Sequence, residues 1–425
     1  MEEIITFLQQ NQEFNVESLI QYVYSKMPKR LNHQRIHYKK YVDNQSNLVQ
    51  VFTESAREYT PWTIYNVCRS IIFDSDNNKV LSYSHPNIEY IENCETMELS
   101  NIQQFTESHE GTLISVFNHN NKWYYATRRH IDMYSTNQII YGVKSELSHG
   151  QMFEDALSKH NLTKESFEVL LDPKFKYNFE LVHYQNKFNI GYDDRFGEKY
   201  AKLFLLFVRD ENQLDIKLIN NNLNIFDNEI LDSTVVSDNL RNSSLVTEGY
   251  IFTQDNHLCK IIHPNYYKVS RYNPGYKTKQ EQYLYLYKKN LLNEYITSTN
   301  NKIYKVINEN ENVEIVGMVS CIFTYIGQRM LDIYYTFNNN NMVHRNEAKY
   351  MELFNSKKYY SIFHTLGMMK GIHMNKQLNI NEMRTLLKFK IDATNMWKLF
   401  NELIAFEEGE ELLTKWSNPL VKMFV

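Results

Sequence analysis

The stretch Glu107-Ser-His-Glu-Gly-Thr-Leu-Ile114 decides how this chain is interpreted. A polar loop ending in Glu-Gly-Thr runs here directly into an apolar strand, and such a loop can present side chains to a ligand. Four other apolar strands are opened or interrupted by one charged residue each: Arg69, Glu180, Glu248 and Lys260. A single charge at a strand end is usually a solvated edge. The five stretches therefore carry weight only as a set.

Short strands rich in Val, Ile, Phe and Tyr surround these stretches, from about residue 48 to 270. The predicted strands are Ser70–Phe73, Thr112–Phe117, Trp123–Ala126, Phe179–Val182, Leu203–Val208 and Gly249–Phe252. A helical insertion is expected near residues 150–171, and the helical spacing within residues 1–28 predicts one or two short helices.

Beyond residue 280 the pattern changes, because apolar residues recur every three or four positions. Helical segments are predicted at 282–298, 314–337, 347–372 and 381–406. The turn signal Tyr272-Asn-Pro-Gly-Tyr276 separates the two regimes. We therefore predict an α+β fold class. A strand-rich domain is expected over 1–280, with a helical lead-in at 1–30, and an all-helical C-terminal domain over 281–425.

Composition limits the class of protein. The 425 residues carry 46 Lys and Arg against 50 Asp and Glu, a formal net charge of −4, so a nucleic-acid partner would need a local basic patch. The hydrophobic share of 43% excludes a fully disordered chain. The four cysteines form no C-x-x-C pair, which excludes a zinc ribbon. An acidic start without an apolar core and short apolar stretches predict a cytoplasmic protein with no membrane partner.

In order and separation, these stretches resemble the motifs of the bacteriophage T4-type ATP-dependent RNA ligase family, within the covalent nucleotidyltransferase superfamily. The matching segments are Cys68–Phe73 (family C-R-G-x-x-F), Ser108–Leu113 (K-x-D/E-G-S/T-L), Asn178–Val182 (N-F-E-h-V), Phe207–Asp210 (V-R-D/E), Glu248–Ile251 (E-G-Y/F-V) and Lys260–Ile262 (K-x-K, half matched). Tyr360–Gly371 resembles part of the family's helical C-terminal domain. The resemblance implies a ligase-type nucleotidyltransferase domain with antiparallel sheets around a nucleotide cleft.

The resemblance also implies a reaction. In this family the first lysine of K-x-D/E-G takes AMP from ATP and passes it to an RNA 5′-phosphate, from which a 3′-hydroxyl displaces it. The implied cofactors are ATP and Mg²⁺. The implied partners are nucleotide and RNA ends, tRNA-like or otherwise structured, in RNA repair, with further protein partners through the helical domain. A viral or phage-like origin, and hence a host cytoplasm, would fit.

Site residues follow from the same match. Catalytic positions are Ser108 (the nucleophile position), Lys260 and Arg69; nucleotide-binding positions are Glu107, Glu110, Gly111, Glu180 (ribose), Phe207, Arg209 and Lys260; the metal position is Glu248.

This chain departs from the family at the nucleophile itself. Ser108 stands where the reactive lysine should be, and a serine hydroxyl is too weak an acid to attack without a dedicated base. Ile262 replaces the second lysine of K-x-K, and His85–Tyr90 occupies the stretch in which another lysine is expected. His109 could in principle form a nucleotidyl intermediate, but a packing role is favoured because strand neighbours face opposite sides.

RNA-binding residues are predicted in two basic segments. Cations alternate with aromatic residues from Tyr266 to Lys279, a composition suited to tracking a backbone and stacking bases. The residues expected to contact RNA are Lys268, Arg271, Lys277 and Lys279, with Lys288–Lys289 continuing the run, and Arg128 and Arg129 in a second cluster.

Three interpretations remain open from the sequence. The chain is a ligase-lineage protein that binds nucleotide and RNA ends without self-adenylylation, or a genuine RNA ligase carrying an inactivating Lys→Ser change, or a structural subunit that keeps the fold and binds neither ligand. The loss at Ile262 as well as at Ser108 favours the first. All three expect Ser108, Glu180, Glu248 and Lys260 to lie within about 10 Å of one another, two strand spacings.

Overall fold

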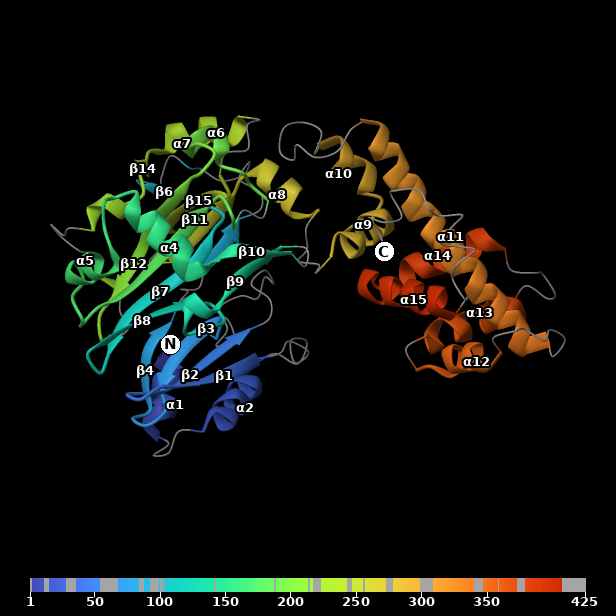
Figure 1. The fold of residues 1–425 in the computed structure, drawn as a ribbon, viewed down its shortest axis with the longest axis horizontal. Coiled ribbons are helices and arrows are strands. Elements are labelled where there is room, and N and C mark those ends of the chain that lie inside the picture. Colours follow the sequence, from blue (N-terminus) through green and yellow to red (C-terminus); the bar gives the residue numbers. More distant parts are fainter. Residues whose placement is uncertain are drawn as a thin grey trace. The chain divides into compact units, whose positions relative to one another are not determined.

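The computed structural model describes residues 2–10, 15–27, 36–53, 68–83, 88–91, 99, 102, 104–140, 143–186, 189–212, 215–216, 223–242, 247–254, 257–272, 278–298, 309–339, 347–357, 359–372 and 379–406. The chain divides into two compact units, Met1–Lys268 and Val269–Val425 (Figure 1). The fold class is mixed α+β with largely antiparallel sheets, as predicted.

In its described residues, the first unit contains four sheets. A four-stranded antiparallel sheet has the order β1-β2-β3-β4, formed by β1 (Ile36–Val42), β2 (Asn47–Thr53), β3 (Ser70–Asp74) and β4 (Lys79–Tyr83). A five-stranded antiparallel sheet has the order β13-β12-β11-β7-β8, formed by β7 (Thr112–His119), β8 (Lys122–Thr127), β11 (Lys176–His183), β12 (Ala201–Arg209) and β13 (Asp215–Ile216). Strands β9 (Asn137–Ile140) and β10 (Val143–Ser148) form a small antiparallel pair.

The remaining sheet carries most of the candidate site. Its order is β14-β6-β15-β16-β5, formed by β5 (Ile88–Ile91), β6 (Phe105–Ser108), β14 (Ile230–Leu231), β15 (Gly249–Gln254) and β16 (His257–Ile262). Strand β5 runs parallel to β16, and the other neighbours are antiparallel. All six strands predicted from the sequence lie within observed strands and are therefore confirmed.

Helices cover the sheets of this unit with their apolar sides. Helices α4 (His149–Ser158) and α5 (Lys164–Val169), with a Ser148–Gln151 capping box at the start of α4, replace the single predicted insertion and share a core with β7, β11 and β12. Helices α1 (Glu2–Gln10) and α2 (Val16–Lys26) share a core with the β1–β4 sheet. The shorter helices are α6 (Asp193–Phe196), α7 (Ser233–Arg241) and α8 (Pro264–Ser270), with 3₁₀ turns at Met133–Ser135 and Asn224–Phe226.

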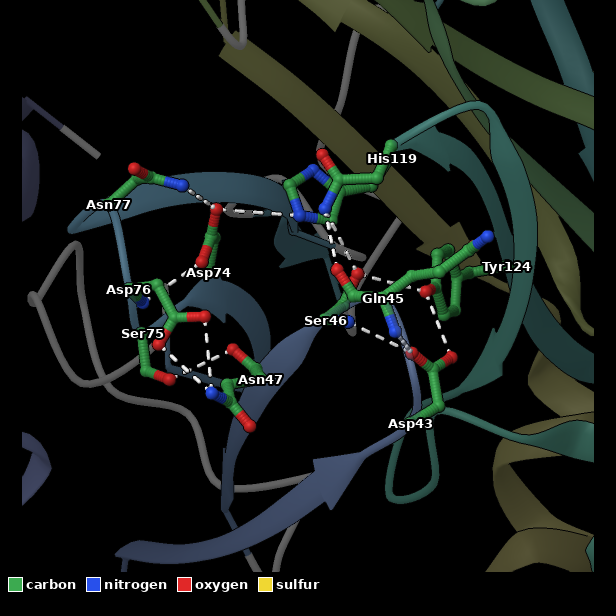
Figure 2. Close-up of polar contacts among 11 residues, drawn as sticks. Asp43, Gln45, Ser46, Asn47, Asp74, Ser75, Asp76, Asn77, His119 and Tyr124 are labelled. Atoms are coloured by element: carbon green, nitrogen blue, oxygen red, sulfur yellow. Dashed lines mark hydrogen bonds and ion pairs between the residues drawn. The ribbon is translucent and has the colours of Figure 1, made fainter.

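Two turns fix the registers of neighbouring strands. Asn120 and Asn121 both have positive φ, 51° and 61°, which is the two-residue turn that suits the β7–β8 hairpin. The β3–β4 turn is held by side chains: Asn77 donates to Asp74 (2.6 Å), and Asn47 on β2 donates to Asp76 (3.0 Å). Figure 2 shows these carboxylates engaged by neighbouring protein groups, which identifies this acidic cluster as a structural feature of the turns.

Every described element lying wholly within the second unit is a helix. They are α9 (Lys279–Lys288), α10 (Leu292–Ser298), α11 (Glu309–Asn339), α12 (Glu347–Asn355), α13 (Tyr360–Ile372), α14 (Ile380–Lys390) and α15 (Ala393–Phe406). Their inward residues form one large core that includes Tyr272. The two units divide at 268/269, earlier than the predicted 280/281, because Tyr272 and α9 pack with the helices. The predicted Asn273–Tyr276 turn lies outside the described residues.

No helix among the described residues has the length and apolar content needed to cross a bilayer.

A substitution at Gly249 would test the pairing of β15 with β6 and β16, on which the site depends. A Cβ at Gly249, where φ is 157°, would lie 2.0 Å from the carbonyl oxygen of Ile261 on β16. Gly249→Ala should therefore destabilise the first unit by about 2–4 kcal/mol and speed hydrogen exchange of β15 and β16 amides. Gly317→Ala in α11 is the matched control, since nothing lies within 4 Å of its Cβ and alanine favours a helix. Equal protection of β15 in Gly249→Ala and the parent would contradict this account.

Candidate functional site

Strand pairing brings together three residues that are far apart in the sequence. Gly249 on β15 is paired with Ser108 on β6, and Ile251 on β15 is paired with Lys260 on β16. The Glu248 N–H donates to the Ser108 carbonyl (3.0 Å), and the Thr247 hydroxyl donates to the same carbonyl (2.6 Å). The backbone thus fixes the positions of Ser108, Glu248 and Lys260, which we call the Ser108 cluster together with Glu180.

One carboxylate oxygen links the side chains of this cluster. Glu248 Oε2 lies 2.7 Å from Lys260 Nζ and 3.4 Å from Ser108 Oγ. Burial alone would lower the pKa of Lys260, but the negative charge of Glu248 outweighs it, and the net effect is a raised pKa. Lys260 is therefore an ammonium ion at neutral pH, and its nitrogen has no lone pair with which to attack.

Glu180 joins the cluster from β11, a strand of the other five-stranded sheet. Gly111 makes the approach possible, because a Cβ there would lie 2.8 Å from Glu180 Cγ and 2.6 Å from the Leu181 carbonyl oxygen. Desolvation by burial, and then the charge of Glu248, raise the pKa of Glu180 to about 8. Most Glu180 side chains are protonated at pH 7, so this carboxyl can both donate and accept a hydrogen bond.

The neighbouring carboxylate, Glu110, fastens the loop to the protein. It accepts from the Asn189 N–H (2.5 Å), the Asn189 side-chain amide (2.7 Å), the Ile190 N–H (2.8 Å) and the Tyr266 hydroxyl (2.9 Å). Burial raises its pKa against the effect of these donors. The geometry gives Glu110 an anchoring role, and a nucleotide contact from it would require breaking these bonds.

Arg195 completes the loop's attachment, although no pattern in the sequence pointed to this residue. Arg195 Nη1 on α6 donates to Glu107 Oε1 at 2.6 Å. His109 is 1% exposed and stacks on Phe204, with 4.2 Å between ring centroids. Burial lowers the pKa of His109 to about 4. The structure therefore gives His109 the packing role that the sequence favoured.

The other predicted nucleotide and phosphate residues lie on separate elements. Arg209 ends β12, where Nη1 donates to the Tyr83 carbonyl (2.5 Å) and the guanidinium lies 3.8 Å from the Tyr83 ring and 4.7 Å from the Phe207 ring. Arg69 is buried in the turn before β3, in the β1–β4 sheet. Their predicted roles toward nucleotide stay predictions.

The predicted RNA surface is corrected in part. Tyr266 and Tyr272 are 4% and 3% exposed and belong to hydrophobic cores, so they present no face for base stacking. Lys268 and Arg271 are exposed, but the unit boundary separates them. Lys277 lies outside the described residues, and only the backbone of Lys279, at the start of α9, is described.

The described residues offer few ligands for a metal ion at the predicted position, Glu248. Within the described part of the chain, no group of three or more His, Cys, Asp or Glu side chains could hold a metal ion. Glu248 is paired with Lys260, which competes for the same oxygen. The described residues therefore do not fit a metal ion held by the protein alone.

Comparisons with known proteins leave the family open. No protein-family model and no curated protein matches the sequence. Among solved structures, the chain is similar to a putative ATP-dependent DNA ligase from Aquifex aeolicus, with a TM-score of 0.36 and 13% identity over 69% of this chain and 78% of that one. An archaeal ATP-dependent RNA ligase gives a TM-score of 0.36 and 9% identity over 66% and 72% of the two chains. Naegleria gruberi RNA ligase with PPi gives 0.27 and 13% over 44% and 64%. Such low scores do not establish family membership.

Glu180 should make stability depend on pH. Its folded pKa of about 8 lies above the ordinary value of 4.5, so the folded state holds this proton more tightly than the unfolded state. Stability should fall as pH rises from about 4.5 to 8 and should then level off. Glu180→Gln removes this effect, and the difference in the free energy of unfolding between parent and variant should change by up to about 5 kcal/mol over that window. Urea unfolding at a series of pH values measures it.

The control for this experiment is Glu211→Gln, an exposed carboxylate in the turn after β12. It should leave the pH profile of the parent unchanged. Parallel profiles for the parent and Glu180→Gln would mean that Glu180 has an ordinary pKa.

Proposed function

We propose that this chain is a non-catalytic relative of ATP-dependent RNA ligases that binds an adenine nucleotide and RNA ends without forming a covalent nucleotidyl intermediate. The observation that carries the proposal is the contact of Ser108, Glu248 and Lys260 around one carboxylate oxygen, with Glu180 beside them. These residues come from motif-like segments up to about 150 residues apart. Their convergence is difficult to explain if the segments resembled the motifs by chance.

The chemistry of the cluster supports binding more than reaction. Nucleotidyl transfer of the ligase type needs a neutral amine, and the two candidate positions offer a hydroxyl at Ser108 and a charged ammonium at Lys260. A protonated Glu180 suits a neutral hydroxyl group such as that of a ribose. Lys260 could attract phosphate oxygens as an ammonium.

Ile262, which replaces the second lysine of K-x-K, is a partly buried residue of the first unit. Ile262 packs against the apolar cluster of Val182, Ile190, Tyr192, Tyr200 and Tyr266. An ammonium at this position would be partly desolvated among these side chains. This packing favours a chain adapted to the loss over a ligase inactivated by one change at Ser108.

Mg²⁺ belongs to the proposal only as an ion brought by the nucleotide. Mg²⁺ commonly binds through one or two carboxylates together with substrate phosphates, and Glu248 is the carboxylate that the cluster could offer. No reaction step is assigned to it.

Nucleotide binding should raise the melting temperature of the protein. A ligand that binds only the folded state at ten times its Kd stabilises it by about 1.4 kcal/mol, which corresponds to about 3–5 °C. We expect this shift with ATP or AMP, and we expect Glu180→Ala to abolish it while keeping the circular dichroism spectrum. Glu211→Ala, an exposed change, should retain it. The absence of a shift in the parent at millimolar nucleotide would favour a structural subunit.

Covalent chemistry should be absent from the parent chain. Incubation with radiolabelled ATP and Mg²⁺ should give no protein-bound AMP, because no neutral amine occupies the cluster. Ser108→Lys should give a weak, acid-labile adduct if Lys260 alone supports the phosphates. Protein-bound AMP in the parent chain would contradict the proposal. If Ser108→Lys also forms no adduct, the change at Ile262 is disabling as well.

A further inference from the structure

A group of basic side chains in the first unit lies on elements outside the Ser108 cluster. Lys39 points from β1, and Arg129 and His130 follow β8 in a turn. Lys39 Nζ lies 2.8 Å from His130 Nε2, so two residues 91 positions apart are in direct contact. The Arg128–Arg129 pair is apparent in the sequence, but no local pattern connects it with β1.

The turn is fixed against the β1–β4 sheet by specific bonds. The Thr127 N–H donates to the His130 carbonyl (2.8 Å), which closes the turn. The Gln50 side-chain amide on β2 donates to the Thr127 carbonyl (2.8 Å), and Arg128 Nη1 reaches the Thr53 carbonyl (3.5 Å). Gln50 is the register partner of Lys39 in the sheet. The basic side chains are therefore held in place by the fold.

Most of the charged groups that act on Lys39 and His130 are basic. Partial burial and then the charge of Arg129 lower the pKa of Lys39. Burial, and then Lys39 and Arg129, lower the pKa of His130, and Asp132 acts in the opposite direction. The Asp132 carboxylate accepts the Tyr134 N–H (2.9 Å). His130 also influences His149, so these are the titratable groups that face it.

Gathering like charges costs free energy that a bound anion would recover. Lys39 uses one ammonium N–H on His130 and has three in total. Arg129 is exposed, and a guanidinium offers a planar fork that fits two phosphate oxygens. A protonated His130 would add a further donor once an anion offsets the repulsion from its neighbours.

We propose that Lys39, Arg129 and His130 form a phosphate-binding site. Its ligand chemistry is a phosphate group, from an RNA backbone or from a free phosphate ester. The proposal deepens the RNA-binding part of the proposed function, and it does not require nucleotide binding at the Ser108 cluster.

The test follows the side-chain signals of His130 by NMR, assigned with His130→Gln, in the full chain. One arm adds inorganic phosphate, and the other adds an oligouridylate that carries no terminal phosphate. Each effective ligand should raise the pKa of His130 by about half a unit or more, because an anion stabilises the imidazolium. A response to the oligouridylate identifies the backbone as a source, and a response to phosphate alone identifies a free ester.

Variants separate this site from general attraction of RNA to positive charge. Lys39→Gln and Arg129→Gln should each weaken oligouridylate or phosphate binding about 3- to 10-fold and make RNA binding less salt-dependent. Lys40→Gln removes an equal charge from the next position of β1, which faces the other side of the sheet, and should change affinity less than twofold.

Two results would overturn the proposal: no response of His130 to either ligand, or an equal loss of affinity in Lys40→Gln and Lys39→Gln. Failure of the proposed function would look different, because the nucleotide-dependent melting shift would be absent while His130 still responded.

Discussion

The ion pair between Glu248 and Lys260 is the interaction on which the candidate site depends. Lys260 lies on β16, Glu248 directly precedes the neighbouring strand β15, and the charge of Glu248 helps to raise the pKa of Glu180 on another sheet. Removing Lys260 would leave carboxyl groups facing one another in a desolvated place, which is costly. The pair also holds the Lys260 amine in its charged form. The same contact thus stabilises the cluster and prevents the Lys260 amine from acting as a nucleophile.

The short loop that follows Ser108 at the end of β6 is anchored by the Glu110 carboxylate. Four donors surround Glu110, and three of them come from Asn189 and Ile190, just after β11. Gly111 allows the following backbone to pass against Glu180. The loop therefore has little freedom, and Ser108 is presented in one fixed position. Such rigidity suits a binding site, because little conformational entropy remains to be lost when a ligand enters.

The two proposed sites divide the functions that a catalytic ligase would combine. The Ser108 cluster offers a protonated carboxyl and one ammonium, a set suited to a ribose and phosphates. The site of Lys39, Arg129 and His130 offers basic groups that act on one another.

The sequence by itself determined the local structure and the identity of the cluster. The six predicted strands and the change to helical periodicity follow from side-chain patterns that act over a few residues, and Glu180, Glu248 and Lys260 stood out as charges within apolar strands. Only the tertiary structure decided which groups meet: Arg195 with Glu107, Asn189 with Glu110, and Lys39 with His130. It also buried Tyr266 and Tyr272, which looked like RNA contacts. The physical reason is that short-range periodicity encodes which face of an element is apolar, whereas contacts between distant segments depend on strand order and register, which no local pattern specifies.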